Sequence, residues 1–278
     1  MTMEYFWETT GSIKKGLGFS HFSSLHLAWI AFFLVSCIIL SLLYRKCGET
    51  GRKRFRFTVA GLILLDEAAK WVMLLATGLW TKNYFPLQLC TINIFIIAWH
   101  TIKPSKLIDN FLYTICVPAA IMALAFPSWT KLPMANFMHI HSFTIHILLA
   151  LYPIMLTVGG DIKPRAKYIL KCLIMLICMA IPVYIFNEFM GTNYMFLAKA
   201  DKGNPLYWFE QNWGNHLLGF PVLAAAIFLV MYGPLELILK LKKKKALTAT
   251  LDARTEEKEK QVVRESLYRT VLKEYGIS

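Results

Sequence analysis

The residues best suited to chemistry in this sequence are one cysteine and three histidines, which stand in two apolar segments. Cys90 lies in YFPLQLCTIN (84–93), and His139, His141 and His146 lie in NFMHIHSFTIHILL (136–149). A thiol beside an imidazole is the smallest nucleophilic pair, because the imidazole takes the thiol proton and leaves a thiolate. The alternative is that Cys90 only packs, since free cysteines are often buried as small apolar residues. The residues alone leave both interpretations open.

The composition is that of a membrane protein rather than of a soluble domain. Apolar residues make up 56% of the 278 residues and charged residues 17%, and the apolar residues come in long runs. A formal net charge of +13 would suggest a nucleic-acid partner for a soluble protein. Here the basic residues gather in short loops, which is typical of cytoplasmic loops that face anionic lipid. We therefore expect membrane lipids as partners and no nucleic acid, while the oligomeric state stays open.

The apolar runs predict an all-α fold, a bundle of seven transmembrane helices in a multi-pass protein of the cell membrane. The bundle covers residues 1–240, with spans at about 22–44, 57–79, 84–102, 107–127, 137–158, 166–189 and 217–239. Basic residues are dense in alternate loops, so the positive-inside rule places the N-terminus outside and the C-terminus in the cytoplasm. Residues 241–278 carry charges of both signs, which predicts a partly helical cytoplasmic tail.

Polar side chains within these spans gather toward the outer face, which favours one site that opens to the outer leaflet. They are Asp66, Glu67, Lys70, Cys90, Asn93, His139, His141, His146, Asn187 and Glu188, and the loop after the sixth span adds Asn193 and Tyr194. Asp66 and Lys70 have the i, i+4 spacing of an ion pair on one helix face. His139 and His146 share one helical stripe, whereas His141 points to another side. A transporter more often places its polar groups at the midplane, on broken helices.

Cys90 is also distinguished by its position near the start of a helix. Pro86 predicts a helix that begins there, and the dipole at such an N-terminus favours a thiolate. Cys90 is the only cysteine near the outer face, so it has no partner for an external disulfide. The three histidines, with Asp66 or Glu188, are also types of zinc ligand. However, no two of them have the i, i+4 spacing that suits a shared ion, so we expect no metal.

Three segments together resemble a known family. They are FPLQLC (85–90), NFMHIHSFTIH (136–146) and GTNYMFL (191–197), with weaker support from LAFPSW (124–129). With these motifs the chain resembles the YwaF-type bacterial integral membrane proteins and their eukaryotic relatives, the transmembrane protein 164 family. The likeness extends from the third span to the loop after the sixth.

The resemblance implies a membrane acyltransferase that needs no cofactor and carries a fatty acyl chain as a cysteine thioester. The chain would come from an outer-leaflet lipid. Cys90 takes the role of nucleophile. His141 is favoured as the base, since its HS step resembles the HT step of related membrane lipid hydrolases, and His146 is the second choice. Asn193 and Tyr194 match the loop motif and would line the substrate site.

The supporting roles follow from depth in the membrane alone, and several rival functions stay open beside the acyltransferase. Gln88, Asn93 or backbone amides near Pro86 would stabilise an oxyanion. Asp66 or Glu188 would orient the histidine, and His139 would lie near the substrate. A lipid esterase would use the same residues with water as the acceptor. A transporter or lipid-binding protein would instead use Asp66, Glu67 and Lys70 as a charged site, and a structural role in envelope assembly is a further alternative.

Overall fold

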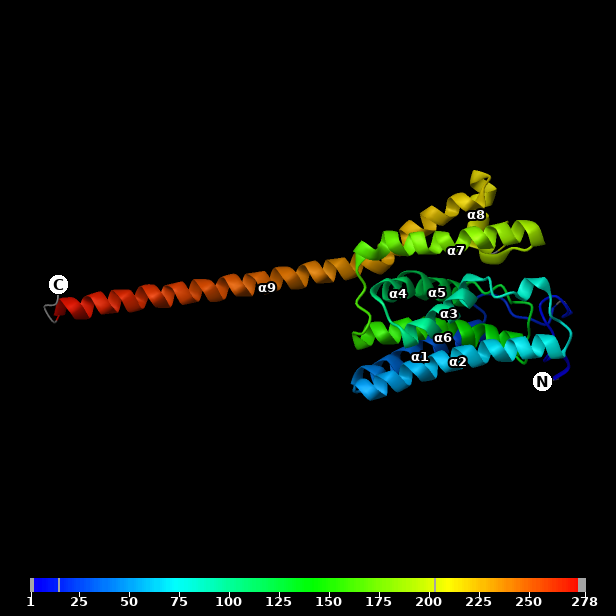
Figure 1. The fold of residues 1–278 in the computed structure, drawn as a ribbon, viewed down its shortest axis with the longest axis horizontal. Coiled ribbons are helices and arrows are strands. Elements are labelled where there is room, and N and C mark those ends of the chain that lie inside the picture. Colours follow the sequence, from blue (N-terminus) through cyan, green and yellow to red (C-terminus); the bar gives the residue numbers. More distant parts are fainter. Residues whose placement is uncertain (1–2, 15, 203, 275–278) are drawn as a thin grey trace. The chain divides into compact units, whose positions relative to one another are not determined.

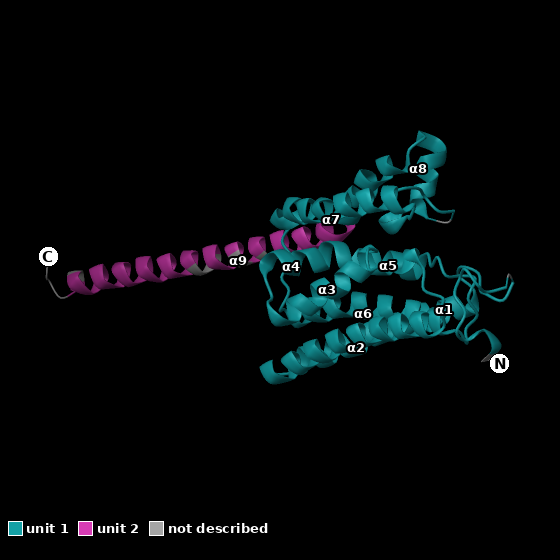
Figure 2. Ribbon diagram, turned by 45° about the vertical axis from the view of Figure 1, so that its right-hand side comes forward, with its two compact units in different colours: residues 1–228 teal, residues 229–278 magenta. Residues whose placement is uncertain are grey.

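The computed structural model describes residues 3–14, 16–202 and 204–274, and each regular element among them is a helix. Residues 1–2, 15, 203 and 275–278 lie outside the description, and with them small parts of the predicted bundle (1–240) and tail (241–278). The chain divides into two compact units, residues 1–228 and 229–278 (Figure 2). The boundary between the units falls within the last helix.

The helices follow one another through short connections (Figure 1). The longer ones are α1 (Ser24–Lys46), α2 (Glu49–Ala76), α3 (Leu89–Ile102), α4 (Lys106–Phe111), α5 (Val117–Ala125), α6 (Phe137–Gly159), α7 (Ile169–Met190), α8 (Pro205–Trp213) and α9 (Gly219–Glu274). A π-helical turn, η3 (Leu112–Cys116), joins α4 to α5. The short 3-10 turns are η1 (Met3–Tyr5), η2 (Lys82–Tyr84), η4 (Ala166–Tyr168), η5 (Tyr194–Phe196) and η6 (His216–Leu218).

Five of the seven predicted spans are confirmed as helices long and apolar enough to cross a membrane. They cover Ser24–Lys46, Lys106–Ala125, Phe137–Gly159, Ala166–Met190 and His216–Leu272. The chain is therefore a multi-pass, all-helical membrane protein in the part that the structure describes. Predicted spans 57–79 and 84–102 do form helices, α2 and α3. However, α2 carries charges in its middle, and the 14 residues of α3 span only roughly 20 Å at 1.5 Å per residue.

Helix α6 is the centre of the first unit. It packs against α1, α2, α3 and α5, and its stretch from Leu149 to Tyr152 is almost completely buried. Burial on all sides suits a helix whose sequence is apolar all round. The outer helices instead expose apolar residues, for example Leu34, Val35 and Ile38 of α1, as helices in contact with lipid chains do. The side chains that α6 carries can therefore meet three or more neighbouring helices.

The π-helical turn ends at Cys116, two residues before Pro118 in the first turn of α5. A proline within a helix removes a backbone donor and crowds the carbonyl of the preceding turn. One wider turn relieves that crowding and lets the helix continue, and such turns are frequent at functional sites. The predicted span 107–127 thus forms one continuous helical segment, made of α4, η3 and α5.

A buried polar network joins the C-terminal part of α3 to its neighbours. His100 places Nδ1 2.9 Å from the Tyr152 hydroxyl and Nε2 2.9 Å from Asp109 Oδ1. The Tyr152 hydroxyl also lies 3.0 Å from Thr101 Oγ1. All four residues are buried, so each side chain gains a partner that replaces water. This network fixes α3 against α4 and α6.

The described part of the tail continues the last helix without a break. Residues 241–274 are helical throughout, as part of α9, although the sequence predicted only partial helix there. The residues from 240 to 270 include many good helix formers and neither proline nor glycine, so nothing local ends the helix.

The segment before α1 packs closely on the loop before α6, and this packing requires a glycine. The Phe19 amide donates to the Thr130 carbonyl at 2.8 Å, and a Cβ on Gly18 would lie 1.9 Å from the same oxygen. We expect Gly18→Ala to lower the free energy of unfolding by about 1–3 kcal/mol, because backbone would have to move. Thermal unfolding of the purified protein in detergent measures this.

Gly61→Ala is the matched control, because a Cβ at Gly61 would meet no atom within 4 Å. It lies inside α2, where alanine favours the helix by about 0.5–1 kcal/mol. Equal losses of stability in the two variants would contradict the role assigned to Gly18.

Candidate functional site

The first turn of α3 and the middle of α6 bring one cysteine and one histidine together. Cys90 Sγ lies 3.2 Å from His146 Nε2, and both side chains are partly buried. This is hydrogen-bond distance for a sulfur donor, so the thiol proton faces the imidazole. The sequence proposed three histidines as partners for Cys90, and His146 is the one that the fold places there.

The His146 ring is held in the form that can accept a proton from Cys90. Its Nδ1 lies 2.6 Å from the Ser142 backbone carbonyl, one turn earlier in α6. A carbonyl oxygen only accepts, so Nδ1 carries the hydrogen and the lone pair of the neutral ring stays on Nε2. The ring also stacks on Trp129, with centroids 5.2 Å apart. Backbone and aromatic contacts thus set both the tautomer and the tilt of the imidazole.

Helix α3 begins at Leu89, with Gln88 as its N-cap, so the prediction that it begins at Pro86 is wrong. Residues 85–88 form a turn instead, in which the Leu87 amide bonds to the Phe85 carbonyl. Cys90 is therefore the second helical residue. The Gln88 side chain does not cap the helix. The described hydrogen bonds use neither the Leu89 nor the Thr91 amide, so both N–H groups stay available as donors.

His141 faces α2 rather than Cys90. Its Nδ1 lies 3.0 Å from Asp66 Oδ1, and its Nε2 lies 3.9 Å from Glu67 Oε2. Asp66 also accepts a hydrogen bond of 2.8 Å from the Thr144 hydroxyl. With both ring nitrogens directed at carboxylates, His141 has no lone pair directed at the thiol.

The predicted pair of Asp66 with Lys70 is wrong. Lys70 Nζ pairs with Glu67 Oε1 at 2.5 Å, and Glu67 also accepts from the Trp71 indole. Asp66 turns toward α6, because His141 and Thr144 offer it two donors there. A contact between helices has here replaced the contact within one helix that the spacing predicted.

His139 is completely buried and faces α1. It accepts a hydrogen bond of 3.0 Å from the Trp29 indole through Nε2, and its Nδ1 lies 3.2 Å from the Leu132 carbonyl. Both nitrogens are thereby engaged in packing contacts. The structure does not bring His139 to Cys90, although His139 and His146 share a stripe of α6.

The GTNYMFL loop closes over the turn before α3. The Met195 amide donates to Gln88 Oε1 at 2.9 Å, and the Tyr194 hydroxyl donates to the Lys82 carbonyl at 2.6 Å. Burial raises the pKa of Tyr194 to about 12, so the phenol stays a donor. Met195 has a φ of 56°, a left-handed conformation that side chains seldom adopt. Such strain persists only where neighbouring contacts hold it.

Asn187, at the end of α7, is the buried residue that organises this loop. Its Oδ1 accepts from the Thr192 hydroxyl and the Tyr194 amide, and its Nδ2 donates to the Tyr194 carbonyl. Asn193 instead bonds within the loop, to the backbone of residues 198 and 199. Glu188 is exposed and makes no contact with a histidine among the described ion pairs and hydrogen bonds. Gln88 and Tyr194 are thus tied to the scaffold of the site.

Two contributors were missed by reasoning from the sequence. Trp129 stacks on His146, and Thr144 supports Asp66. Trp129 belongs to the LAFPSW segment, which gave the weakest likeness to a family, so its signal was present but indistinct. Thr144 looked like one more residue of an apolar helix, and only the position of α2 reveals its partner.

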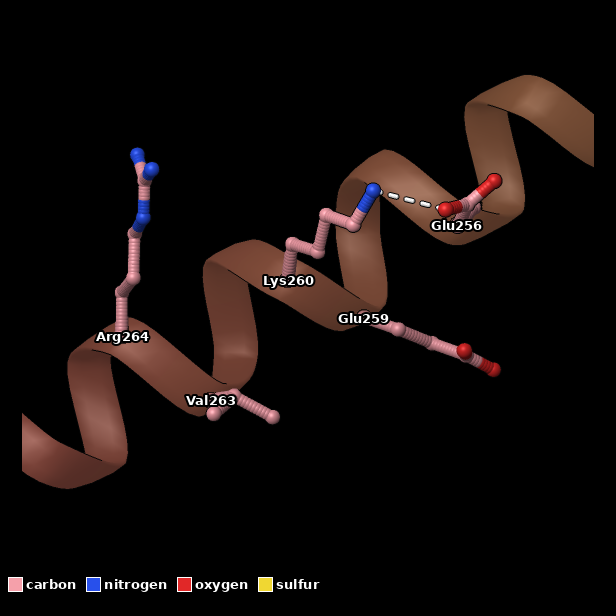
Figure 3. Close-up of a pocket in the computed structure, with 5 residues that line it drawn as sticks. All are labelled: Glu256, Glu259, Lys260, Val263 and Arg264. Carbon is pink, nitrogen blue, oxygen red and sulfur yellow. Dashed lines mark hydrogen bonds and ion pairs between the residues drawn. The ribbon is translucent and has the colours of Figure 1, made fainter.

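A pocket on α9 offers no comparable pair of nucleophile and base. This shallow pocket is lined by residues that are all exposed, and its Lys260–Glu256 pair lies along one helix at 2.6 Å (Figure 3). Among the described residues, no three His, Cys, Asp or Glu side chains are grouped as metal ligands. All six cysteines are free thiols.

Comparison with known proteins assigns most of the chain to one family. Residues 17–232 match the TMEM164 family, which confirms the inferred resemblance to the transmembrane protein 164 family. The matched range includes Cys90, His146 and the loop at 191–197. No curated protein and no solved structure matches the chain.

The Glu67–Lys70 pair beside the site is buried, with side-chain exposures of 9% and 11%. Glu67→Gln leaves the Lys70 charge without its partner, and we expect a loss of about 3 kcal/mol in unfolding free energy. The double variant Glu67→Gln/Lys70→Met removes both charges and should be more stable than Glu67→Gln alone. Thermal unfolding in detergent compares the variants.

The exposed Lys260–Glu256 pair is the control, with side-chain exposures of 71% and 67%. Glu256→Gln should change the free energy of unfolding by less than about 1 kcal/mol. Similar losses for Glu67→Gln and Glu256→Gln would show that the inner pair is not buried as described.

Proposed function

Because the chain belongs to the TMEM164 family and pairs a thiol with an imidazole inside its helical bundle, we propose that it is a membrane-embedded acyltransferase. The acyl chain is carried as a thioester on Cys90. The observation that carries the proposal is the 3.2 Å contact between Cys90 Sγ and His146 Nε2, with the His146 tautomer set by Ser142. No cofactor takes part, since a thiolate attacks an ester without one.

In the first half-reaction, His146 Nε2 takes the thiol proton and the thiolate attacks the carbonyl carbon of a lipid ester. The carbonyl oxygen becomes an oxyanion, which the free N–H groups of Leu89 and Thr91 stabilise together with the positive end of the α3 dipole. The ester C–O bond then breaks. The leaving alcohol takes the proton from His146, and the acyl group stays on Cys90 as a thioester.

In the second half-reaction, an acceptor loses its proton to His146 Nε2 as it attacks the thioester carbonyl. The C–S bond breaks, and the Cys90 thiolate regains the proton from His146. The enzyme returns to its starting state, and the acyl chain has moved from one lipid to another.

The base in this proposal is His146, although the sequence favoured His141. His141 is engaged by Asp66, with Glu67 opposite, and these contacts direct it away from Cys90. His141 instead belongs to the polar contacts between α6 and α2 beside the site. Gln88, Asn193 and Tyr194 shape the substrate site through the loop that they hold, rather than through contact with the reacting atoms.

The proposed topology has seven spans, with α2 and α3 as the second and third. It places the N-terminus outside, the C-terminus in the cytoplasm and Cys90 toward the outer leaflet of the cell membrane. The support is the density of basic residues in alternate loops and in the run from Lys240 to Lys245. An outer-leaflet phospholipid is then the acyl donor, which suits transfer between lipids without a soluble acyl carrier.

Replacement of the two paired residues tests the proposal. Cys90→Ala should give no acylated protein, and His146→Ala should slow acylation of Cys90 by about 10²–10⁴-fold, because the thiol loses its base. His141→Ala should slow it by less than about tenfold. Mass spectrometry of protein purified from its membrane, with and without hydroxylamine to cleave thioesters, measures the acylated fraction.

Cys178→Ala is the matched control, because Cys178 is an exposed thiol on α7 outside the site. It should be acylated on Cys90 like the wild type. Loss of acylation in His141→Ala but not in His146→Ala would overturn the assignment of the base. A wild-type protein that never carries an acyl group on Cys90 would overturn the enzyme itself.

A further inference from the structure

Asn93 is a buried polar side chain without a partner. It is 1% exposed, and its Oδ1 is completely covered and accepts no hydrogen bond. The described hydrogen bonds also include none from its Nδ2. A buried amide without partners costs folding free energy, so nearly all such groups in native proteins are paired. Six other described side chains also bury a polar atom without a partner, so the case for Asn93 rests on its place beside Cys90.

The position of Asn93 supplies that reason. It lies three residues after Cys90 in α3, so the two side chains are neighbours on adjoining turns. Side chains of a helix lean toward its N-terminus, which directs the Asn93 amide back to the turn that carries the thiol. That turn also holds the unused N–H groups of Leu89 and Thr91. An unpartnered amide and unused backbone donors thus surround one nucleophile.

Gln88 shows the contrast. Both Gln88 and Asn93 carry amides near Cys90, and the sequence proposed either one to stabilise an oxyanion. Gln88 Oε1 already accepts from the Met195 amide and holds the loop, whereas Asn93 is engaged with no described residue. The fold therefore assigns Gln88 to the scaffold and leaves Asn93 for the substrate.

We propose that Asn93 donates a hydrogen bond from Nδ2 to the acyl carbonyl oxygen and completes an oxyanion hole with the first-turn N–H groups of α3. This role rests on the acyl transfer proposed above. As the thiolate or the acceptor attacks, the carbonyl π electrons move onto the oxygen, and Asn93 stabilises that charge without giving up a proton. The same donors serve both half-reactions, because the carbonyl carbon is bonded to Cys90 Sγ in both tetrahedral intermediates.

The test uses full-length protein in detergent micelles with p-nitrophenyl palmitate as the ester, so that the burst of p-nitrophenolate reports acylation of Cys90. We expect Asn93→Leu to slow the burst by about 10²–10³-fold, the loss typical of one oxyanion donor. KM for the ester should change by less than about threefold, because the bond forms only in the transition state. Ile94→Val alters the packing of the next residue and should keep the burst.

The thermal stability of the same variant supplies a second measurement. Asn93→Leu should lose reaction rate but gain stability. Asn93→Leu replaces an unpartnered amide by an apolar side chain of similar size, so its Tm should rise by about 2–4 °C. Gln88→Leu should lower Tm, because it leaves the Met195 amide without its acceptor. If the replacement of Asn93 stabilises the protein and also slows acylation, Asn93 is retained for the reaction.

The outcomes separate the two proposals. A wild-type protein without a burst that depends on Cys90 would refute the acyl-enzyme. A wild-type burst that Asn93→Leu retains would refute the role of Asn93 alone. A lower Tm for Asn93→Leu, with a burst no slower than that of Ile94→Val, would show that Asn93 serves packing.

Discussion

Polar groups inside a membrane bundle must find partners in the protein, and this requirement organises the first unit around α6. Its three histidines and Tyr152 find partners on three neighbouring helices. His139 meets Trp29 of α1, His141 meets Asp66 of α2, and His146 and Tyr152 meet Cys90 and His100 of α3. Water is absent from hydrocarbon, so an unmet donor or acceptor there costs several kcal/mol. The same contacts that pair these groups also fix the order of helices around α6, and with it the position of the thiol.

The sequence predicted features that depend on one helix at a time and missed those that depend on two. The stripe shared by His139 and His146, and the different direction of His141, follow from helical periodicity. Which of the three histidines reaches Cys90 depends on where α1, α2 and α3 pack, and no local pattern encodes that. The partner of Asp66 likewise depends on how the helices pack. Its spacing to Lys70 suits an ion pair, but His141 and Thr144 of α6 bind it instead. The start of α3 was displaced from Pro86 to Leu89 because the chain first makes a tight turn.

The three motifs that carry the family likeness are distant in the sequence and adjoin one another in the fold. FPLQLC contributes Cys90 to the pair with His146, from the second motif, and Gln88 to the Met195 amide, from the third. The likeness therefore has a physical basis, namely a thiol, its base and the strained loop that closes over the turn before them. Each of these contacts requires both partners, so the three motifs depend on one another.

The bond from His146 Nδ1 to the carbonyl of residue 142 has a consequence for how the site can vary. In many hydrolytic triads a carboxylate side chain orients the imidazole, so mutation of that one residue disables the enzyme. Here a peptide oxygen one helical turn away does so, and every residue type at position 142 that keeps the helix supplies it. The orienting group therefore cannot be lost by substitution of a side chain. A designer could transplant the base with its tautomer on a single stretch of helix, whereas the tilt of the ring would still need a partner for Trp129.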